Sequence, residues 1–189
     1  AMLHKKILEQ RDGRLEQVSR MLGERFDQAN GDEIKDFVAQ FYARVPPEDV
    51  CAAVPENLYG AALSLWKFAA QRNPGQAKLR VYNPRTEEHG WKSHRTIVEI
   101  VTDDMPFLVD SVTGNLNKWD CRVHLAIHPV VRLRRDGGGE RLELLPPVAP
   151  SINGKAGNSE AVMHIQIAEQ SDPATLERIA ADLAAVLAD

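Results

Sequence analysis

The spacing of apolar residues changes near residue 76, and this change limits the folds that the chain can adopt. Before that point apolar side chains recur every three or four residues, which is the spacing of one helix face. After it, "KLRVYNP" (78–84) and "RTIVEIV" (95–101) have the period of two and the β-branched residues of strands. The sequence therefore predicts a helical N-terminal region over residues 1–75 and a second domain over residues 76–189.

Three amphipathic helices are predicted in the first region. Their apolar stripes are Leu15, Val18, Leu22 and Phe26, then Ile34, Phe37, Val38, Phe41 and Tyr42, then Leu58, Ala62, Leu65, Trp66 and Ala69. The sequence "NGDE" separates the first two helices. Asp32 within it is expected to be an N-cap, because its carboxylate can accept hydrogen bonds from free backbone N–H groups. Pro74 and Gly75 end the region.

The second domain shows the order strand, helix, three strands, helix. A helix starting near Pro106 is followed by a long strand over 122–135, which Pro129 bends or confines to an edge. The glycines of "DGGGE" predict a hairpin turn, and a polar loop over 146–160 is expected to be mobile. A strand over 161–169 precedes a helix capped by Asp172. This order predicts an α+β fold, a ferredoxin-like two-layer sandwich with a mainly antiparallel sheet and helices on one face.

Composition limits the cellular setting and the partners. The net charge of −4 gives no general attraction to nucleic acid or to anionic membranes. Two cysteines, Cys51 and Cys121, without metal-binding spacing suit a reducing cytoplasm. No apolar run is long enough for a signal peptide or a membrane span. Ala1 precedes Met2 and the chain stops inside a helical pattern, so we expect a piece of a longer protein.

The stretch "EIVTDDMPFLVDSVTGNL" (99–116) predicts a strand, an acidic loop and a helix. Asp103, Asp104 and Asp110 could divide acid and base work or bind a divalent metal. A structural role is favoured, because carboxylates stabilise the positive end of a helix and Asp104 can cap its free N–H groups. The same turn can also hold the carboxylate of a small ligand.

Three histidines and an arginine-rich hairpin suggest further sites. His124 and His128 lie about 13 Å apart if extended, too far to share one zinc ion, so we interpret them and His164 as buried or interface residues. The hairpin holds Arg132, Arg134, Arg135 and Arg141, but the strands lack the aromatics of RNA-binding sandwiches. With no dinucleotide fingerprint and no nucleophile motif, the residues favour a noncatalytic module without metal.

Several separated blocks resemble the N-terminal region of the very large bacterial NAD-dependent glutamate dehydrogenases. These blocks are "DFVAQFYARVPPEDV", "NLYGAALSLWKFAAQRNPGQAKLRVYNP", "GWKSHRTIVEIVTDDMPFLVDSV", "VHLAIHPVVRLRRD" and "MHIQIAEQSD", and the likeness covers roughly residues 33–189. The resemblance implies a parent enzyme that oxidatively deaminates L-glutamate with NAD. It also implies that the catalytic and NAD-binding parts lie elsewhere in that enzyme, and that this segment serves assembly or allosteric control in a homo-oligomer, contacting other domains or subunits.

The acidic loop also resembles that of ACT domains, which often bind amino acids between their first strand and helix. Their loop reads D-x-P-G-x-L; here Asp104 and Pro106 match, whereas Phe107 replaces the glycine. The resemblance implies an amino-acid effector site formed by Asp103, Asp104, Met105, Phe107 and Leu108, commonly placed at a subunit interface in such domains. The polar sheet face with His124, His128 and His164 is the surface that we expect to meet another subunit or domain. ACT domains usually end with a further strand, so either 78–84 occupies that edge or the strand lies beyond Asp189.

Overall fold

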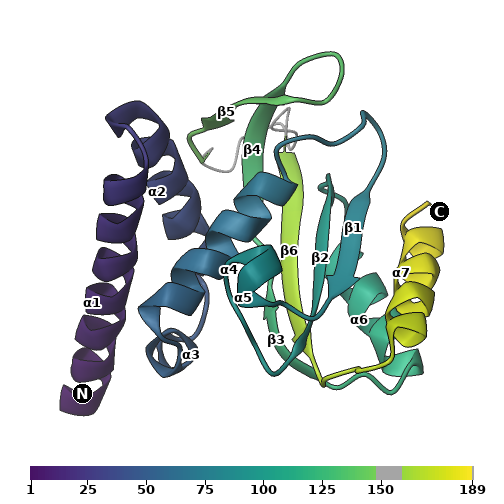
Figure 1. Ribbon diagram of the computed structural model, residues 1–189, viewed down its shortest axis with the longest axis horizontal. Coiled ribbons are helices and arrows are strands. Elements are labelled where there is room, and N and C mark those ends of the chain that lie inside the picture. The colour runs from purple at the N-terminus through teal and green to yellow at the C-terminus, as the bar shows by residue number, and fades with distance from the viewer. Residues whose placement is uncertain (148–158, 189) are drawn as a thin grey trace. The chain divides into compact units, whose positions relative to one another are not determined.

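The computed structural model describes residues 1–147 and 159–188 (Figure 1). The chain divides into two compact units. The first comprises Ala1–Lys67 with Arg85–Lys92, and the second comprises Phe68–Pro84 with the chain from Ser93 onward. Among the described residues, no helix combines the length and the apolar character that crossing a membrane requires.

The first unit is helical. It contains α1 (Met2–Arg25), α2 (Gln28–Tyr42), α3 (Pro47–Ala52), α4 (Pro55–Phe68, of which Phe68 belongs to the second unit) and α5 (Thr86–His89). Most residues of the predicted stripes are buried, Val18, Leu22, Phe37 and Leu65 among them. The expectation that Asp32 caps α2 is wrong. The helix starts one turn earlier, where the Asp27 carboxylate accepts from the Asn30 N–H at 2.9 Å.

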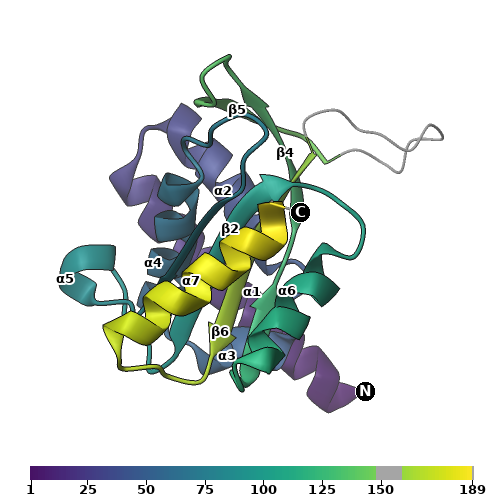
Figure 2. The same ribbon diagram turned by 90° about the vertical axis from the view of Figure 1, so that its right-hand side faces the viewer.

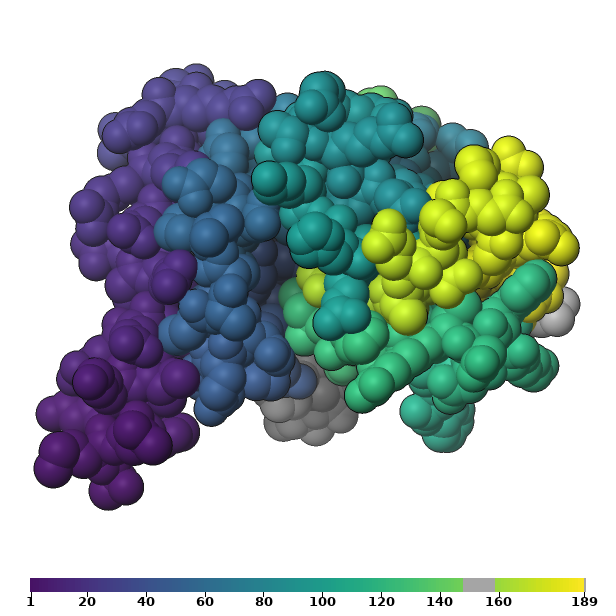
Figure 3. Space-filling view, turned by 60° about the horizontal axis from the view of Figure 1, so that its bottom comes forward, coloured from purple at the N-terminus to yellow at the C-terminus, as the bar shows by residue number. Residues whose placement is uncertain are grey.

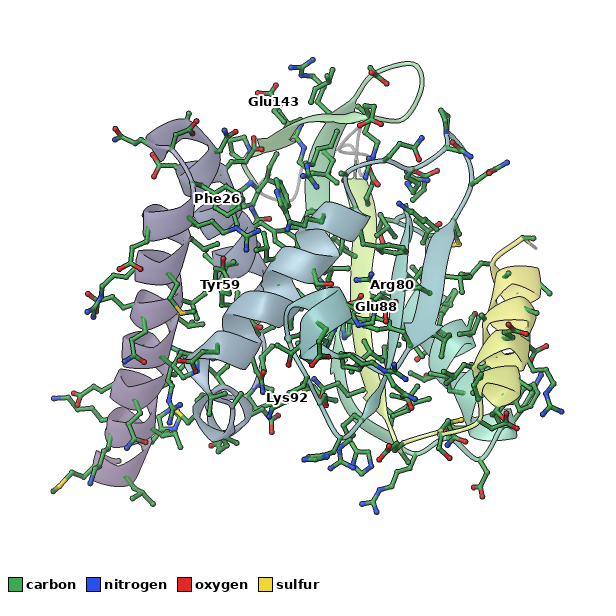
Figure 4. The ribbon with its side chains drawn as sticks, viewed as in Figure 1. Phe26, Tyr59, Arg80, Glu88, Lys92 and Glu143 are labelled. Atoms are coloured by element: carbon green, nitrogen blue, oxygen red, sulfur yellow. The ribbon has the colours of Figure 1, made fainter. Side chains whose placement is uncertain are left out.

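Aromatic side chains form the core of this unit. The Phe37 ring stacks on Phe41 at 5.8 Å and contacts the Trp66 ring at 5.0 Å. The Tyr42 hydroxyl donates to the Leu58 carbonyl at 2.8 Å, so α2 and α4 are joined by a buried polar contact as well. At the surface, the Arg25 guanidinium donates to Tyr59, which Figure 4 labels.

Gly60 lets α4 approach the segment that follows α5. A Cβ at this position would lie 2.5 Å from the Trp91 Cβ and 2.7 Å from the Gly90 carbonyl oxygen. We expect Gly60→Ala to lower the free energy of unfolding by about 1–3 kcal/mol, because the backbone must shift to relieve the overlap. Gly13→Ala is the matched control, since no described residue comes within 4 Å of its Cβ in α1; it should raise stability by about 0.5–1 kcal/mol. Urea unfolding of both variants tests this, and equal effects would contradict it.

The second unit is a six-stranded antiparallel sheet. Its strands are β1 (Lys78–Tyr82), β2 (Thr96–Asp103), β3 (Val123–Ile127), β4 (Val130–Arg135), β5 (Arg141–Leu145) and β6 (Ser159–Ile167). They lie in the order β1-β2-β6-β4-β5, and β3 also pairs with β6. The predicted long strand is interrupted at His128 and Pro129, and both halves pair with β6. The loop expected over 146–160 lies largely outside the described residues, and its last two positions belong to β6.

β1 occupies the edge position beside β2. In a ferredoxin-like sheet the strand after the second helix pairs with the first strand of the motif, which here is β2. That place is taken by β1, which pairs antiparallel with β2 from Lys78↔Val101 to Tyr82↔Ile97. Leu79 and Val81 on β1 pack against the main core. The first of the two alternatives left by the sequence is therefore the one observed.

Helices α6 (Leu108–Lys118) and α7 (Pro173–Ala188) cover one face of this sheet (Figure 2). In space-filling view the yellow surface of α7 adjoins the green surface of the α6 region (Figure 3). Alternate residues of β2 and β6 meet the helices in one apolar core, formed by Val98, Ile100, Met163, Ile165, Ile167, Val112, Leu116, Ile179 and Leu183 among others. The Asp172 cap is confirmed, since its carboxylate accepts from the Ala174 N–H at 3.0 Å. The predicted α+β sandwich is thus confirmed.

The opposite face of the sheet carries buried ionisable side chains in two clusters. In the first, the Glu99 carboxylate receives hydrogen bonds from Arg80 (2.8 Å) and Tyr82 (3.0 Å) and contacts His164 Nδ1 at 2.8 Å. Arg80 is labelled in Figure 4. In the second, Glu160 binds both Arg72 and Arg135. Each of the two buried carboxylates therefore has at least one arginine beside it.

The Glu99 cluster makes stability depend on pH. Burial of the Glu99 carboxyl favours its neutral form, but the hydrogen bond and charge of His164, together with Arg80, outweigh burial and lower its pKa. The stabilisation is therefore complete above the pKa of the unfolded chain, about 4.3, and is lost as the pH falls through the lower folded-state value. We expect the thermal midpoint to fall with decreasing pH in this range. Glu99→Gln should flatten the dependence; an unchanged slope in that variant would contradict this assignment.

Candidate functional site

The loop between β2 and α6 has a geometry that its sequence explains only in part. The chain leaves β2 at Asp103, and the Asp104 N–H donates to the Ser159 carbonyl at 3.2 Å, which fixes the loop to the start of β6. Pro106 follows, and Phe107 adopts φ 63° and ψ 14°, the left-handed conformation. The helix then starts at Leu108 without a side-chain cap. The interpretation of Asp104 as the helix cap is therefore wrong, because Phe107 holds the N-cap position.

Phe107 is strained and exposed. A left-handed conformation costs an L-residue about 1–2 kcal/mol, and a bulky residue rarely adopts it. Glycine has no such cost, so the turn itself explains why the ACT pattern places glycine here. The Phe107 side chain is also 78% exposed, so its burial does not offset the strain. Strain that persists without a packing benefit points to a functional position.

Replacing Phe107 with glycine should therefore stabilise the folded chain. We expect Phe107→Gly to raise the free energy of unfolding by about 1 kcal/mol, since relief of the left-handed strain exceeds the added chain entropy of glycine. Asp120→Gly is the matched control, because Asp120 also has a positive φ of 55° but aspartate tolerates that region better. Urea unfolding should show little gain for the control. A loss of stability in Phe107→Gly would show that the ring makes a favourable contact.

A pocket of about 300 Å³ opens beside this loop. Asp104, Met105 and Phe107 line it from the loop, and Leu108, Val109 and Asp110 line it from the first turn of α6. The link between β3 and β4 contributes His128, β4 contributes Val130, and β6 contributes Ala161 and Met163. Four of the five predicted effector residues therefore line one cavity.

Asp103, the fifth predicted residue, points elsewhere. Alternation along β2 places it with Glu99 on the sheet face opposite the helices, where its carboxylate accepts from Arg72 at 2.7 Å. This separates Asp103 from Asp104 and Asp110, the other two carboxylates considered for acid–base chemistry. Among the residues that the structure describes, no three His, Cys, Asp or Glu side chains are grouped so that they could hold a metal ion.

The three histidines lie in different surroundings. His164 is 1% exposed and belongs to the Glu99 cluster. His124 is exposed and lies 2.8 Å from an Arg95 nitrogen; desolvation and the charges of Arg95 and Arg122 lower its pKa. Only His128 lines the pocket. The structure does not bring them together on one surface.

The hairpin arginines serve the fold. Arg135 donates to Glu160 at 2.8 Å and to the carbonyls of Gly139 and Ala69, both at 2.8 Å. Arg134 pairs with Glu143 at 2.7 Å on the surface.

The sequence did not predict the pocket residues Val130, Ala161 and Met163, because it is the pairing of β4 with β6 that brings them to the loop.

The sheet order, the two helices on one face and a pocket at the first strand–helix loop define an ACT-like α+β domain. The chain belongs to the family described as "Glutamate dehydrogenase, ACT1 domain", which matches residues 37–183. It is similar to the NAD-specific glutamate dehydrogenase of Halomonas elongata, with 38% identity over 98% of this chain and 11% of the relative. The enzyme of the same name from Pseudomonas aeruginosa is 35% identical over 69% of this chain and 8% of the relative. The chain thus spans about a tenth of the length of these relatives.

Proposed function

We propose that this chain is a noncatalytic regulatory and assembly segment of a large NAD-dependent glutamate dehydrogenase, and that the β2–α6 pocket binds a free amino acid as effector. The parent reaction would convert L-glutamate and NAD to 2-oxoglutarate, ammonia and NADH in the cytoplasm, with NAD bound by another part of the enzyme. Partners would be other domains or subunits of a homo-oligomer. The observation that carries the proposal is the pocket, because its lining includes the loop residues predicted from the ACT pattern.

The lining has groups for both ends of an amino acid. Asp104 and Asp110 offer carboxylates to an ammonium group. No side chain of the described residues caps the first turn of α6, so its backbone N–H groups and the positive end of the helix dipole suit a carboxylate. Binding at this loop would also cover Phe107, which gives the effector a means of changing the surface that other domains meet.

Thermal unfolding of the chain with a panel of free amino acids tests the effector site. A ligand present at 100 times its Kd stabilises by about 2.7 kcal/mol, so the midpoint should rise visibly. We expect Asp104→Ala to abolish the rise. Asp103→Asn is the matched control, since its carboxylate lies on the other sheet face; its midpoint can differ, but the rise on adding ligand should remain. Loss of the rise in both variants would contradict the assignment of the site.

A docking module without ligand is the alternative, and the exposed apolar residues at the pocket favour it. Phe107, Val130 and Met105 are 78%, 51% and 39% exposed, and together they form an apolar surface that another domain could cover. This alternative predicts no midpoint rise with any amino acid. It also predicts that Phe107→Ala weakens self-association, measured by analytical ultracentrifugation, which the effector role does not require.

A further inference from the structure

The charged groups that line the pocket are acidic. Asp104 and Asp110 contribute two carboxylates, His128 is the remaining ionisable lining residue, and no lysine or arginine is among the described lining. The nearest arginine along β4 is Arg132, which donates to the Pro146 carbonyl at 3.1 Å and does not line the pocket. Arg72 is held by Glu160 and Asp103. Within the described part of the chain, a second carboxylate on a ligand would therefore meet like charges and no counter-ion.

The inner wall of the pocket is apolar. Leu108, Ala161 and Met163 are buried at its base, and Val130 and Phe107 flank them. A side-chain carboxylate placed there would lose its hydration without gaining hydrogen bonds, which costs several kcal/mol. An apolar side chain in the same place gains about 25 cal/mol for each Å² removed from water. The wall therefore favours a ligand whose side chain ends in an apolar group over one whose side chain ends in a carboxylate.

The volume sets the size of the ligand. About 300 Å³ is the lower end of the range for small-molecule pockets. This volume suits one amino acid of moderate size. The exposed ring of Phe107 forms part of the lining, so a bound apolar side chain would shield it from water.

We propose that the pocket selects amino acids with an apolar side chain and rejects dicarboxylates, including glutamate and 2-oxoglutarate. The proposal rests on the effector site above and adds its specificity. The segment would then respond to a metabolite that differs chemically from both carbon compounds of the parent reaction. Feedback by those compounds would have to act at another site.

Isothermal titration of the chain with L-norvaline and L-glutamate is the direct test. The two ligands share the α-amino and α-carboxyl groups and a three-carbon side chain, which ends in a methyl group in one and a carboxylate in the other. We expect norvaline to bind at least about tenfold more tightly, a difference of about 1.4 kcal/mol. L-Leucine should also bind, and 2-oxoglutarate should not.

A lysine at the pocket should reverse the preference. Val130→Lys introduces an ammonium group into the lining, so glutamate should gain affinity relative to norvaline. Leu142→Lys adds the same charge at a site of similar exposure, 48% against 51%, on the neighbouring strand β5 and outside the pocket. The control should leave the ratio of the two affinities unchanged. An equal change in both variants would overturn the role of the lining.

The two proposals fail in different ways. If no amino acid binds, the effector site and its specificity are both wrong. If glutamate binds as tightly as norvaline and Asp104→Ala abolishes both, the effector site stands and the proposed specificity is wrong.

Discussion

Gly139→Ala should lower the free energy of unfolding by at least about 3 kcal/mol and the thermal midpoint by roughly 6–12 °C. Gly139 has φ 92°, a conformation that L side chains rarely adopt, and a Cβ there would overlap the carbonyl group of Arg72. Neither obstacle can be relieved by rotating a side chain, because both involve the backbone. The turn would have to move away from the segment that follows α4.

That segment and the turn are joined by several hydrogen bonds that such a movement would break. The Arg72 N–H donates to the Gly139 carbonyl at 3.0 Å, and the Arg141 N–H donates to the Ala70 carbonyl at 2.7 Å. Arg135 donates to the same Gly139 carbonyl. The loss is therefore cooperative and includes the contacts that position the Glu160 cluster.

Gly137→Ala, two residues earlier in the same turn, is the matched control. None of the residues that the structure describes lies within 4 Å of its Cβ and its φ is not positive, so its effect should stay within about 0.5 kcal/mol. Calorimetry of the two variants gives the comparison. Equal midpoints for Gly139→Ala and Gly137→Ala would show that the turn does not need the close approach to Arg72.

Arg72→Met should also be strongly destabilising, by about 3 kcal/mol. Arg72 is 5% exposed and donates to Glu160 at 3.0 Å, to Asp103 at 2.7 Å and to the Gln76 carbonyl at 2.8 Å. Methionine fills much of the volume but provides no donor. Glu160 would still have Arg135 as a counter-ion, so the loss of unfolding free energy should lie near the lower end of the range for a broken buried pair.

Arg134→Met provides the control for this variant. Arg134 pairs with Glu143 at 2.7 Å, as close as Arg72 to Asp103, but its side chain is 51% exposed. An exposed pair contributes less than about 1 kcal/mol. Denaturant unfolding should therefore separate the two variants clearly. A loss in Arg72→Met no larger than in Arg134→Met would mean that the buried cluster contributes no more than a surface pair.

Sequence patterns predicted the elements of this fold better than their connections. The period of two in "RTIVEIV" predicted a strand, and β2 indeed has Val98 and Ile100 on one face and Glu99 on the other, because strand geometry depends only on local spacing. The cap of α2 was misplaced by one turn, since Asp27 and Asp32 are both good N-caps and only packing decides between them. The edge position of β1 also needed tertiary information.

In the candidate site, too, the features that depend on local sequence were predicted and those that depend on tertiary pairing were not. Asp104, Met105, Phe107 and Leu108 could be selected from the loop pattern, because a strand–helix turn is local. Asp103 and Asp104 look equivalent in the sequence. Because successive side chains of a strand point to opposite sheet faces, the Asp103 carboxylate lies away from the pocket and accepts a hydrogen bond from Arg72. Arg72, Glu160 and Val130 come from distant segments whose pairing no local pattern records.

The edge position of β1 has a consequence for how the sheet forms. Tyr82 pairs with Ile97, so this edge joins strands that are neighbours in the sequence, whereas a strand after α7 would be separated from β2 in the sequence by four strands and two helices. Closing a short loop costs less chain entropy than closing a long one. Taking the edge strand from upstream of β2 therefore lowers the contact order of the sheet, the property that correlates with faster folding across small domains.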